Sequence, residues 1–127
     1  MTDIWYSYVA TTTTKALVLR SFFEYLYQSL HDLNVPMSVD LFGMTTTNTD
    51  DLNIGQVLEN ALPYFNYISP MVYPSHYPAH FNGLSNPNLY PYEVVNYSMS
   101  RAVERVKAAS TTPLKLRKDK GWDLIIH

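Results

Sequence analysis

The chain has 127 residues, which suits one ordinary domain, whereas a complete (β/α)8 barrel needs about 250. Hydrophobic residues make up 46% and charged residues 16%, a composition that builds a packed core and excludes a disordered chain. The formal net charge of −2 predicts no nucleic-acid partner, and the absence of cysteine excludes disulfides and thiolate metal sites.

No targeting or membrane segment is expected. The first residues carry an acid, Asp3, where a signal peptide has a basic region, and their apolar stretch is too short for one. No run approaches the roughly 20 apolar residues of a membrane span. The localisation therefore stays unassigned.

The first elements in chain order are a short β-like run over residues 4–9, a threonine loop and a clear helix over residues 15–33. Asn34 is the expected C-cap, and Pro36 forbids continuation of the helix. The helix is predicted from apolar residues at three- and four-residue spacing, which are Leu19, Phe22, Phe23, Leu26, Leu30 and Leu33.

The middle of the chain predicts two buried strands separated by a helix. Residues 35–43 and residues 65–73 are short and mostly apolar, as parallel strands buried on both faces are. Between them, Asp50 or Asp51 is expected to cap a helix over residues 52–62.

Prolines crowd residues 74–91, which predicts one long ordered loop that leads into a helix over residues 91–109. A further strand is expected at residues 113–117, and residues 118–127 fit no periodic pattern. Strands that alternate with helices predict the α/β class with a parallel sheet. Because no glycine-rich phosphate loop follows a strand, a partial (β/α)8 (TIM-type) barrel, about half of one, is favoured over a nucleotide-binding fold.

Asp40 is the first candidate functional residue. It lies near the end of a predicted apolar strand beside Phe42, and acids at the carboxyl ends of barrel strands bind substrate or catalyse. A carboxylate in such a strand is costly unless it is paired or faces a polar site. The alternative is an Asp that only hydrogen-bonds neighbouring backbone at a strand-to-loop turn.

The second candidate site is formed by Tyr73, Ser75, His76 and Tyr77, directly after the second strand, and its three rings make an aromatic rim. These rings offer a face for stacking and a polar tip for hydroxyl groups, and flanking prolines restrict the loop. The alternative is a loop whose rings simply cover the end of the fold. His76 and His80 have the four-residue spacing of a zinc pair, but no further ligand is nearby, so neither a metal nor a cofactor is expected.

Glycoside hydrolysis normally needs two carboxyl groups flanking the bond. The sequence offers one good strand carboxylate, because every glutamate falls on a predicted helix and Asp50 and Asp51 fall in a loop. The second carboxylate is therefore not identified.

Three segments, VDLFGM (39–44), IGQVLENALPYFNYISPMVYPSHYP (54–78) and NPNLYPYEVV (86–95), resemble the bacterial family of putative glycosyl hydrolase domains. The resemblance covers about residues 19–117. It implies a (β/α)8 barrel related to sugar-processing barrels, with Asp40 as a catalytic or sugar-binding carboxylate. It further implies substrate contacts from Phe42, Tyr73, His76 and Tyr77.

The sequence departs from the family at three places. An EIQFDYVRFP-like acidic strand motif of the family has no match here, and the position before Tyr67, often Asp in the family, is Asn66. Residues 118–127 do not continue as the family does. The expectation is that residues 1–127 form a single fragment of a barrel, with a divergent tail.

The leading interpretation is a glycoside-hydrolase-like fragment that acts on or binds a polysaccharide. The open edges of a half barrel would favour self-association. The alternatives are a non-catalytic carbohydrate-binding module and a structural fragment without activity.

Overall fold

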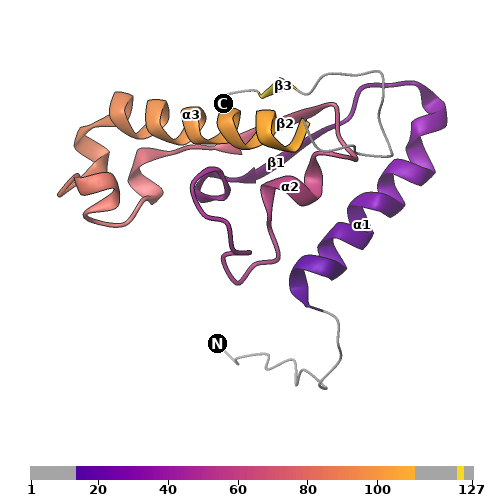
Figure 1. Ribbon diagram of the computed structural model, residues 1–127, viewed down its shortest axis with the longest axis horizontal. Coiled ribbons are helices and arrows are strands. Elements are labelled where there is room, and N and C mark those ends of the chain that lie inside the picture. The colour runs from indigo at the N-terminus through magenta and orange to yellow at the C-terminus, as the bar shows by residue number, and fades with distance from the viewer. Residues whose placement is uncertain (1–13, 111–122, 125–127) are drawn as a thin grey trace.

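The computed structural model describes residues 14–110 and 123–124 of the chain (Figure 1). Helices and strands alternate, so the expected α/β class with parallel strands is confirmed. The elements are α1 (Lys15–Leu30), β1 (Ser38–Phe42), α2 (Leu58–Ala61), β2 (Tyr67–Met71), α3 (Pro91–Ser110) and β3 (Asp123–Leu124).

The sheet has the order β1-β2-β3, and both pairings are parallel. Ser38 lies opposite Tyr67 at one end of the β1–β2 pair, and Phe42 lies opposite Met71 at the other. The short strand β3 falls in the tail, residues 118–127, for which no regular structure was predicted, so that prediction was wrong there. The runs expected at residues 4–9 and 113–117 lie outside the described residues.

Helix α1 begins where expected, because the Thr14 side chain accepts a hydrogen bond from the Leu17 N–H. One 3-10 turn, His31–Leu33, follows it, and Asn34 ends the segment in the left-handed conformation with φ of 54°. The predicted C-cap is therefore confirmed. The apolar stripe is only partly correct, since Phe23 is buried whereas Phe22 is 51% exposed.

The helix predicted over residues 52–62 is largely wrong, because only Leu58–Ala61 is helical. The side chains of Asp50 and Asp51 accept hydrogen bonds from backbone N–H groups two residues on, in the loop. Leu52 and Asn53 then both take positive φ, which no helix permits. Local hydrogen bonding by aspartate thus competes successfully with helix formation.

The main core lies between the sheet and the helices (Figure 1), and α2 contacts both α1 and α3. Phe23 packs edge to face on Phe65, with 5.2 Å between ring centroids. None of the helices in the described part of the chain has the length and apolar character needed to span a bilayer. The buried members of this cluster are Phe23, Leu41, Leu58, Ala61, Leu62, Tyr64, Phe65, Ile68, Ala102 and Val106.

Candidate functional site

Asp40 lies in the middle of β1, on the sheet face opposite the helices. Its neighbour Leu41 is 1% exposed and belongs to the main core, so side-chain alternation directs Asp40 to the other face. Asp40 is exposed and is paired in register with Ser69 of β2. By the same alternation Phe42 shares the face of Asp40, which brings two predicted site residues together.

The carboxyl ends of β1 and β2 are held unusually close at Gly43. A Cβ at this position would lie 2.3 Å from the carbonyl oxygen of Met71, so only glycine fits without movement of the backbone. The Phe42 N–H donates to the Gln56 side chain over 2.7 Å, which anchors the loop after β1 to the end of its own strand. Both loops are thereby fixed at one edge of the sheet.

Tyr73 and His76 lie just beyond β2, at this same edge. Their rings meet edge to face, with 5.4 Å between centroids and an interplanar angle of 69°. Both residues are exposed, and the 3-10 turn Pro74–His76 sets their spacing. Tyr73 follows Ser69, the partner of Asp40, by four positions, and the last two of these lie beyond the end of β2.

Tyr77, in contrast, is 6% exposed and points into a second core cluster. Its hydroxyl lies 3.1 Å from the Ser98 Oγ of α3, and its ring packs on Phe81 at 4.5 Å. Burial raises the pKa of the Tyr77 hydroxyl, and hydrogen bonds with Ser98 and Thr46 offset only part of that effect. The structure thus separates Tyr77 from the exposed pair formed by Tyr73 and His76.

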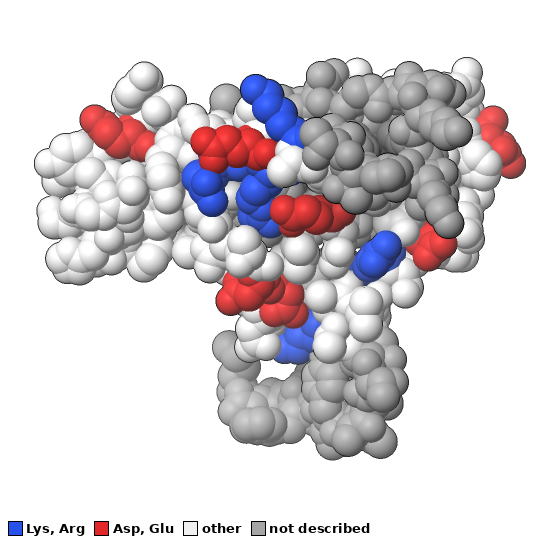
Figure 2. All heavy atoms as spheres, viewed as in Figure 1, with Lys and Arg blue, Asp and Glu red and all other residues white. Residues whose placement is uncertain are grey.

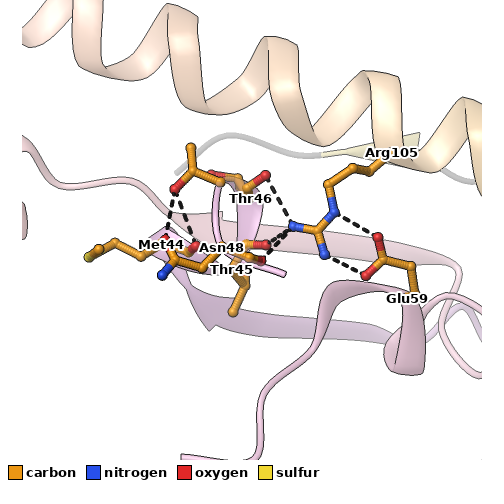
Figure 3. Close-up of polar contacts among 7 residues, drawn as sticks. Met44, Thr45, Thr46, Asn48, Glu59 and Arg105 are labelled. Carbon is orange, nitrogen blue, oxygen red and sulfur yellow. Dashed lines mark hydrogen bonds and ion pairs between the residues drawn. The ribbon is translucent and has the colours of Figure 1, made fainter. Parts of the chain in front are cut away.

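Arg105 of α3 ties the loop after β1 to α2 (Figure 3). Its guanidinium binds both carboxylate oxygens of Glu59, at 2.6 and 2.5 Å. It also donates to the backbone carbonyls of Thr45, Thr46 and Asn48, the last two over 3.2 and 2.8 Å. This one side chain therefore links α3 to two other segments, α2 and the loop after β1.

Burial raises the pKa of Glu59, but the hydrogen bonds from Arg105 and from its own backbone, together with the charge of Arg105, outweigh burial. The net pKa of Glu59 lies below its ordinary value, so the carboxylate is ionised near neutral pH. Glu59 is therefore engaged in a structural ion pair.

The surface around the rim is uncharged. Residues 74–91 contain no Asp, Glu, Lys or Arg. In Figure 2 the end of the molecule formed by these loops is almost entirely white, while acidic and basic side chains are interspersed over the middle. Among the described residues, no group of three or more side chains is placed to hold a metal ion. The rim therefore offers aromatic rings and neutral polar groups, with the Asp40 carboxylate two residues back along β1, a combination suited to polyhydroxylated ligands.

A family model described as "Putative glycosyl hydrolase domain" matches residues 1–117. The chain belongs to this family. Comparison with curated proteins and with solved structures gave no match. The resemblance found in the sequence segments is thus confirmed at the level of the glycosyl hydrolase family, with no substrate attached to it.

Asn66, the position at which the resemblance suggested an Asp, lies at the opposite end of the strands from Tyr73. Its side-chain oxygen accepts a hydrogen bond from the Met37 N–H over 3.0 Å, and its own N–H donates to the Met37 carbonyl over 2.8 Å. Asn66 therefore joins the amino end of β2 to the segment before β1. Its position gives it a structural part, at the amino end of β2 and remote from the Tyr73–His76 pair.

Sequence reasoning missed Gly43, Gln56 and Arg105, the residues that fix the loops of this glycosyl-hydrolase-like domain. One signal for Arg105 was available, because it lies one position before Val106 on the stripe of α3 that faces the core. A charge at the edge of such a stripe needs a partner. Nothing in the sequence indicated which carbonyls it would bind.

Proposed function

We propose that this chain is a glycoside-hydrolase-like, carbohydrate-active domain that binds a polysaccharide at the carboxyl edge of its parallel strands. The proposal includes the finer fold assignment, a single partial (β/α) barrel over residues 1–127. Membership of the glycosyl hydrolase family supports the chemistry, and the parallel β–α order supports the architecture.

The observation that carries the proposal is the shared edge. Asp40 and Phe42 occupy the sheet face away from the helices. The Tyr73–His76 pair follows the neighbouring strand β2 at its carboxyl end. Ligands of parallel sheets bind beyond the carboxyl ends of the strands. A sugar at this edge would find a carboxylate for its hydroxyl groups and rings for its apolar face.

In this proposal Asp40 is the catalytic or sugar-binding carboxylate, and Phe42, Tyr73 and His76 are contact residues. We assign Tyr77 to holding the rim in place, because its hydroxyl is buried against Ser98.

The test is affinity electrophoresis against a panel of polysaccharides, with release of reducing ends measured in parallel. Tyr73→Ala should weaken binding about tenfold, the loss of roughly 1.4 kcal/mol expected for one exposed stacking ring. Tyr25→Ala is the matched control, since Tyr25 is an exposed tyrosine on α1 away from the edge. Asp40→Asn should abolish release and weaken binding less than Tyr73→Ala does, because the amide oxygen still accepts hydrogen bonds from sugar hydroxyl groups. Equal losses for the two tyrosine variants would refute the proposed rim.

A second candidate is a carbohydrate-binding domain without turnover. The observation that favours it is the carboxylate count: Asp40 is the only acidic side chain on β1 or β2, and Glu59 is engaged by Arg105. Glycosidases normally use two acids. Binding that is sensitive to Tyr73→Ala, together with no release by the native chain, would select this candidate.

A further inference from the structure

Two 3-10 turns of the proline-rich loop pack against each other beyond the carboxyl end of β2. They are Pro74–His76 and Pro87–Leu89, and a further turn separates them in the sequence. Helix α3 contacts both of them. Tyr73 directly precedes the first turn, and Tyr90 directly follows the second. The proposed sugar site contains only the first of these two tyrosines.

Tyr73 and Tyr90 are alike in exposure and in the way their backbones are held. Their side chains are 40% and 42% exposed. The Tyr73 N–H donates to the Met71 carbonyl over 3.1 Å, and the Tyr73 carbonyl accepts the His76 N–H over 2.9 Å. The Tyr90 N–H donates to the Pro87 carbonyl over 3.0 Å, and the Tyr90 carbonyl accepts an N–H from the first turn of α3 over 3.1 Å. A residue whose backbone is held on both sides loses little conformational freedom when it binds a ligand.

The loop between the two turns is anchored to the core from inside. The Tyr77 ring packs on Phe81 with 4.5 Å between centroids, and Phe81 meets Tyr97 of α3 edge to face at 5.8 Å. Pro87, the first residue of the second turn, is buried. The inward side chains therefore fix the two turns, and the outward side chains keep their places relative to each other.

The outward side chains of the two turns are large and uncharged. Leu89 is 69% exposed beside Tyr90, and Tyr73 lies against the His76 ring. Half-exposed rings with a hydroxyl tip suit a sugar, because a sugar has an apolar face edged by hydroxyl groups. We call this the double-turn surface, and it consists of Tyr73, His76, Leu89 and Tyr90.

The charged residues nearest to the double-turn surface along the chain are acidic. Residues 74–91 contain no Asp, Glu, Lys or Arg, and Glu93 lies in the first turn of α3. The first basic residue of α3 is Arg101, which lies about 15 Å along the helix from its start. Arg101 is moreover paired with Glu104 over 2.7 Å. An anionic polysaccharide would find no Lys or Arg on the loop or at the start of α3, whereas a neutral one needs none.

We propose that the double-turn surface binds several consecutive units of a neutral polysaccharide, with Tyr90 as a second stacking ring in addition to Tyr73. This inference rests on the proposed function and names the class of its substrate. Two fixed rings on packed turns contact different units of one sugar chain. A single sugar reaches only one ring, so affinity rises with chain length.

The experiment is affinity electrophoresis of the whole chain at pH 8, where histidine adds no positive charge. The neutral probes are mixed-linkage β-glucan, xyloglucan and galactomannan, and the acidic probes are polygalacturonate and alginate. The native chain should be retarded by a neutral polysaccharide and by neither acidic one. Tyr90→Ala should weaken that retardation about tenfold, as Tyr73→Ala does, and Tyr90→Phe should retain most of it. Tyr25→Ala, at an exposed tyrosine of α1, is the matched control.

Chain length is tested with oligosaccharides prepared from the polysaccharide that retards the native chain. Affinity measured by titration calorimetry should rise from the single sugar to the longer oligosaccharides, and Tyr90→Ala should reduce this rise. Circular dichroism establishes that each variant is folded.

Charge selection is tested by adding a cation. Leu89→Lys places an ammonium group beside Tyr90 and should allow polygalacturonate to retard the chain. Leu33→Lys is the matched control, since Leu33 is 66% exposed and lies in the turn after α1. Equal retardation of the two lysine variants would overturn the charge argument.

The outcomes separate this inference from the proposed function. If Tyr73→Ala weakened binding and Tyr90→Ala did not, the second ring would be overturned and the proposed function would stand. Retardation of the native chain by polygalacturonate or alginate would overturn the neutral class of substrate. If no polysaccharide retarded the native chain, the proposed function itself would fail, and this inference with it.

Discussion

Arg105 offers the sharpest test of how the loop after β1 is held. The substitution Arg105→Ala removes five hydrogen bonds at once, two to the Glu59 carboxylate and three to backbone carbonyls of residues 45, 46 and 48. The Arg105 side chain is only 10% exposed, so water cannot easily replace these contacts. The variant should therefore be less stable and should have a looser loop behind Asp40.

The magnitude follows from the burial of each partner. Removing one member of a fully buried ion pair costs about 3–5 kcal/mol, but the Glu59 side chain is 41% exposed and regains water. That exposure reduces the contribution of the ion pair to the free energy of unfolding. The carbonyls lie deeper, and each loses a hydrogen bond worth about 1 kcal/mol. We expect Arg105→Ala to lower the free energy of unfolding by about 3 kcal/mol and Glu59→Gln by about 1 kcal/mol.

The assay is urea unfolding followed by circular dichroism, at one fixed protein concentration because self-association would add to the measured stability. Arg105→Lys is the control that keeps the charge and loses the planar guanidinium. It should lie between the native chain and Arg105→Ala. If Arg105→Ala lost less than about 1 kcal/mol, or no more than Glu59→Gln, the carbonyl contacts would not contribute as argued.

The same pair predicts a pH dependence. The pKa of Glu59 in the folded chain lies below its ordinary value of 4.5. Its stabilising contribution is therefore fully present above that value and is lost as the pH falls through the lower, folded pKa. The stability difference between the native chain and Glu59→Gln should shrink from about pH 5 to about pH 3. A difference that stayed constant over this range would refute the ionic role.

Three further substitutions test the packing by the same urea titration. Gly43→Ala should cost about 2 kcal/mol, because its Cβ would meet a backbone carbonyl; no loss would mean that the strand ends can separate. Phe23→Ala should cost about 3–5 kcal/mol and Phe22→Ala under about 1, and equal losses would contradict the orientation of α1. Tyr77→Phe should lower the free energy of unfolding by about 1 kcal/mol, because it leaves the buried Ser98 hydroxyl unpaired. No change in stability would contradict the role of Tyr77 in holding the rim.

Periodicity predicted the long helices well, because their burial pattern extends over many residues. Helix α3 begins at Pro91 as predicted, and α1 begins at Lys15. The helix over residues 52–62 failed for a local reason, since the aspartates at 50 and 51 hydrogen-bond the backbone in turns. Whether such turns displace a helix depends on the contacts that the rest of the fold makes with each conformation. The spacing of apolar residues carries no information about those contacts.

The residues of the candidate site were likewise predictable only in part. Asp40 was singled out as a carboxylate near the end of a mostly apolar strand, and the proline-rich loop placed Tyr73 and His76 beyond the next strand. The strand around Asp40 was expected to be buried on both faces, which was wrong, because Leu41 is the one buried residue of β1. Tyr77 was grouped with them because it follows directly in the sequence. A 3-10 turn ends at His76, and the next side chain, Tyr77, points inward to Ser98. The position at which this turn ends therefore determines that the His76 ring lies at the surface and the Tyr77 ring lies in the core.

Asn66 shows how location changes the meaning of a substitution. The family resemblance suggested an aspartate at this position, and an Asn in its place would then imply a weakened enzyme. However, residue 66 precedes β2, and its side-chain oxygen accepts the Met37 N–H. An aspartate oxygen can accept that same hydrogen bond, so either residue can hold the two strands in register. Because ligands of open parallel sheets bind beyond the other end of the strands, Asn66 lies away from the edge proposed to bind sugar.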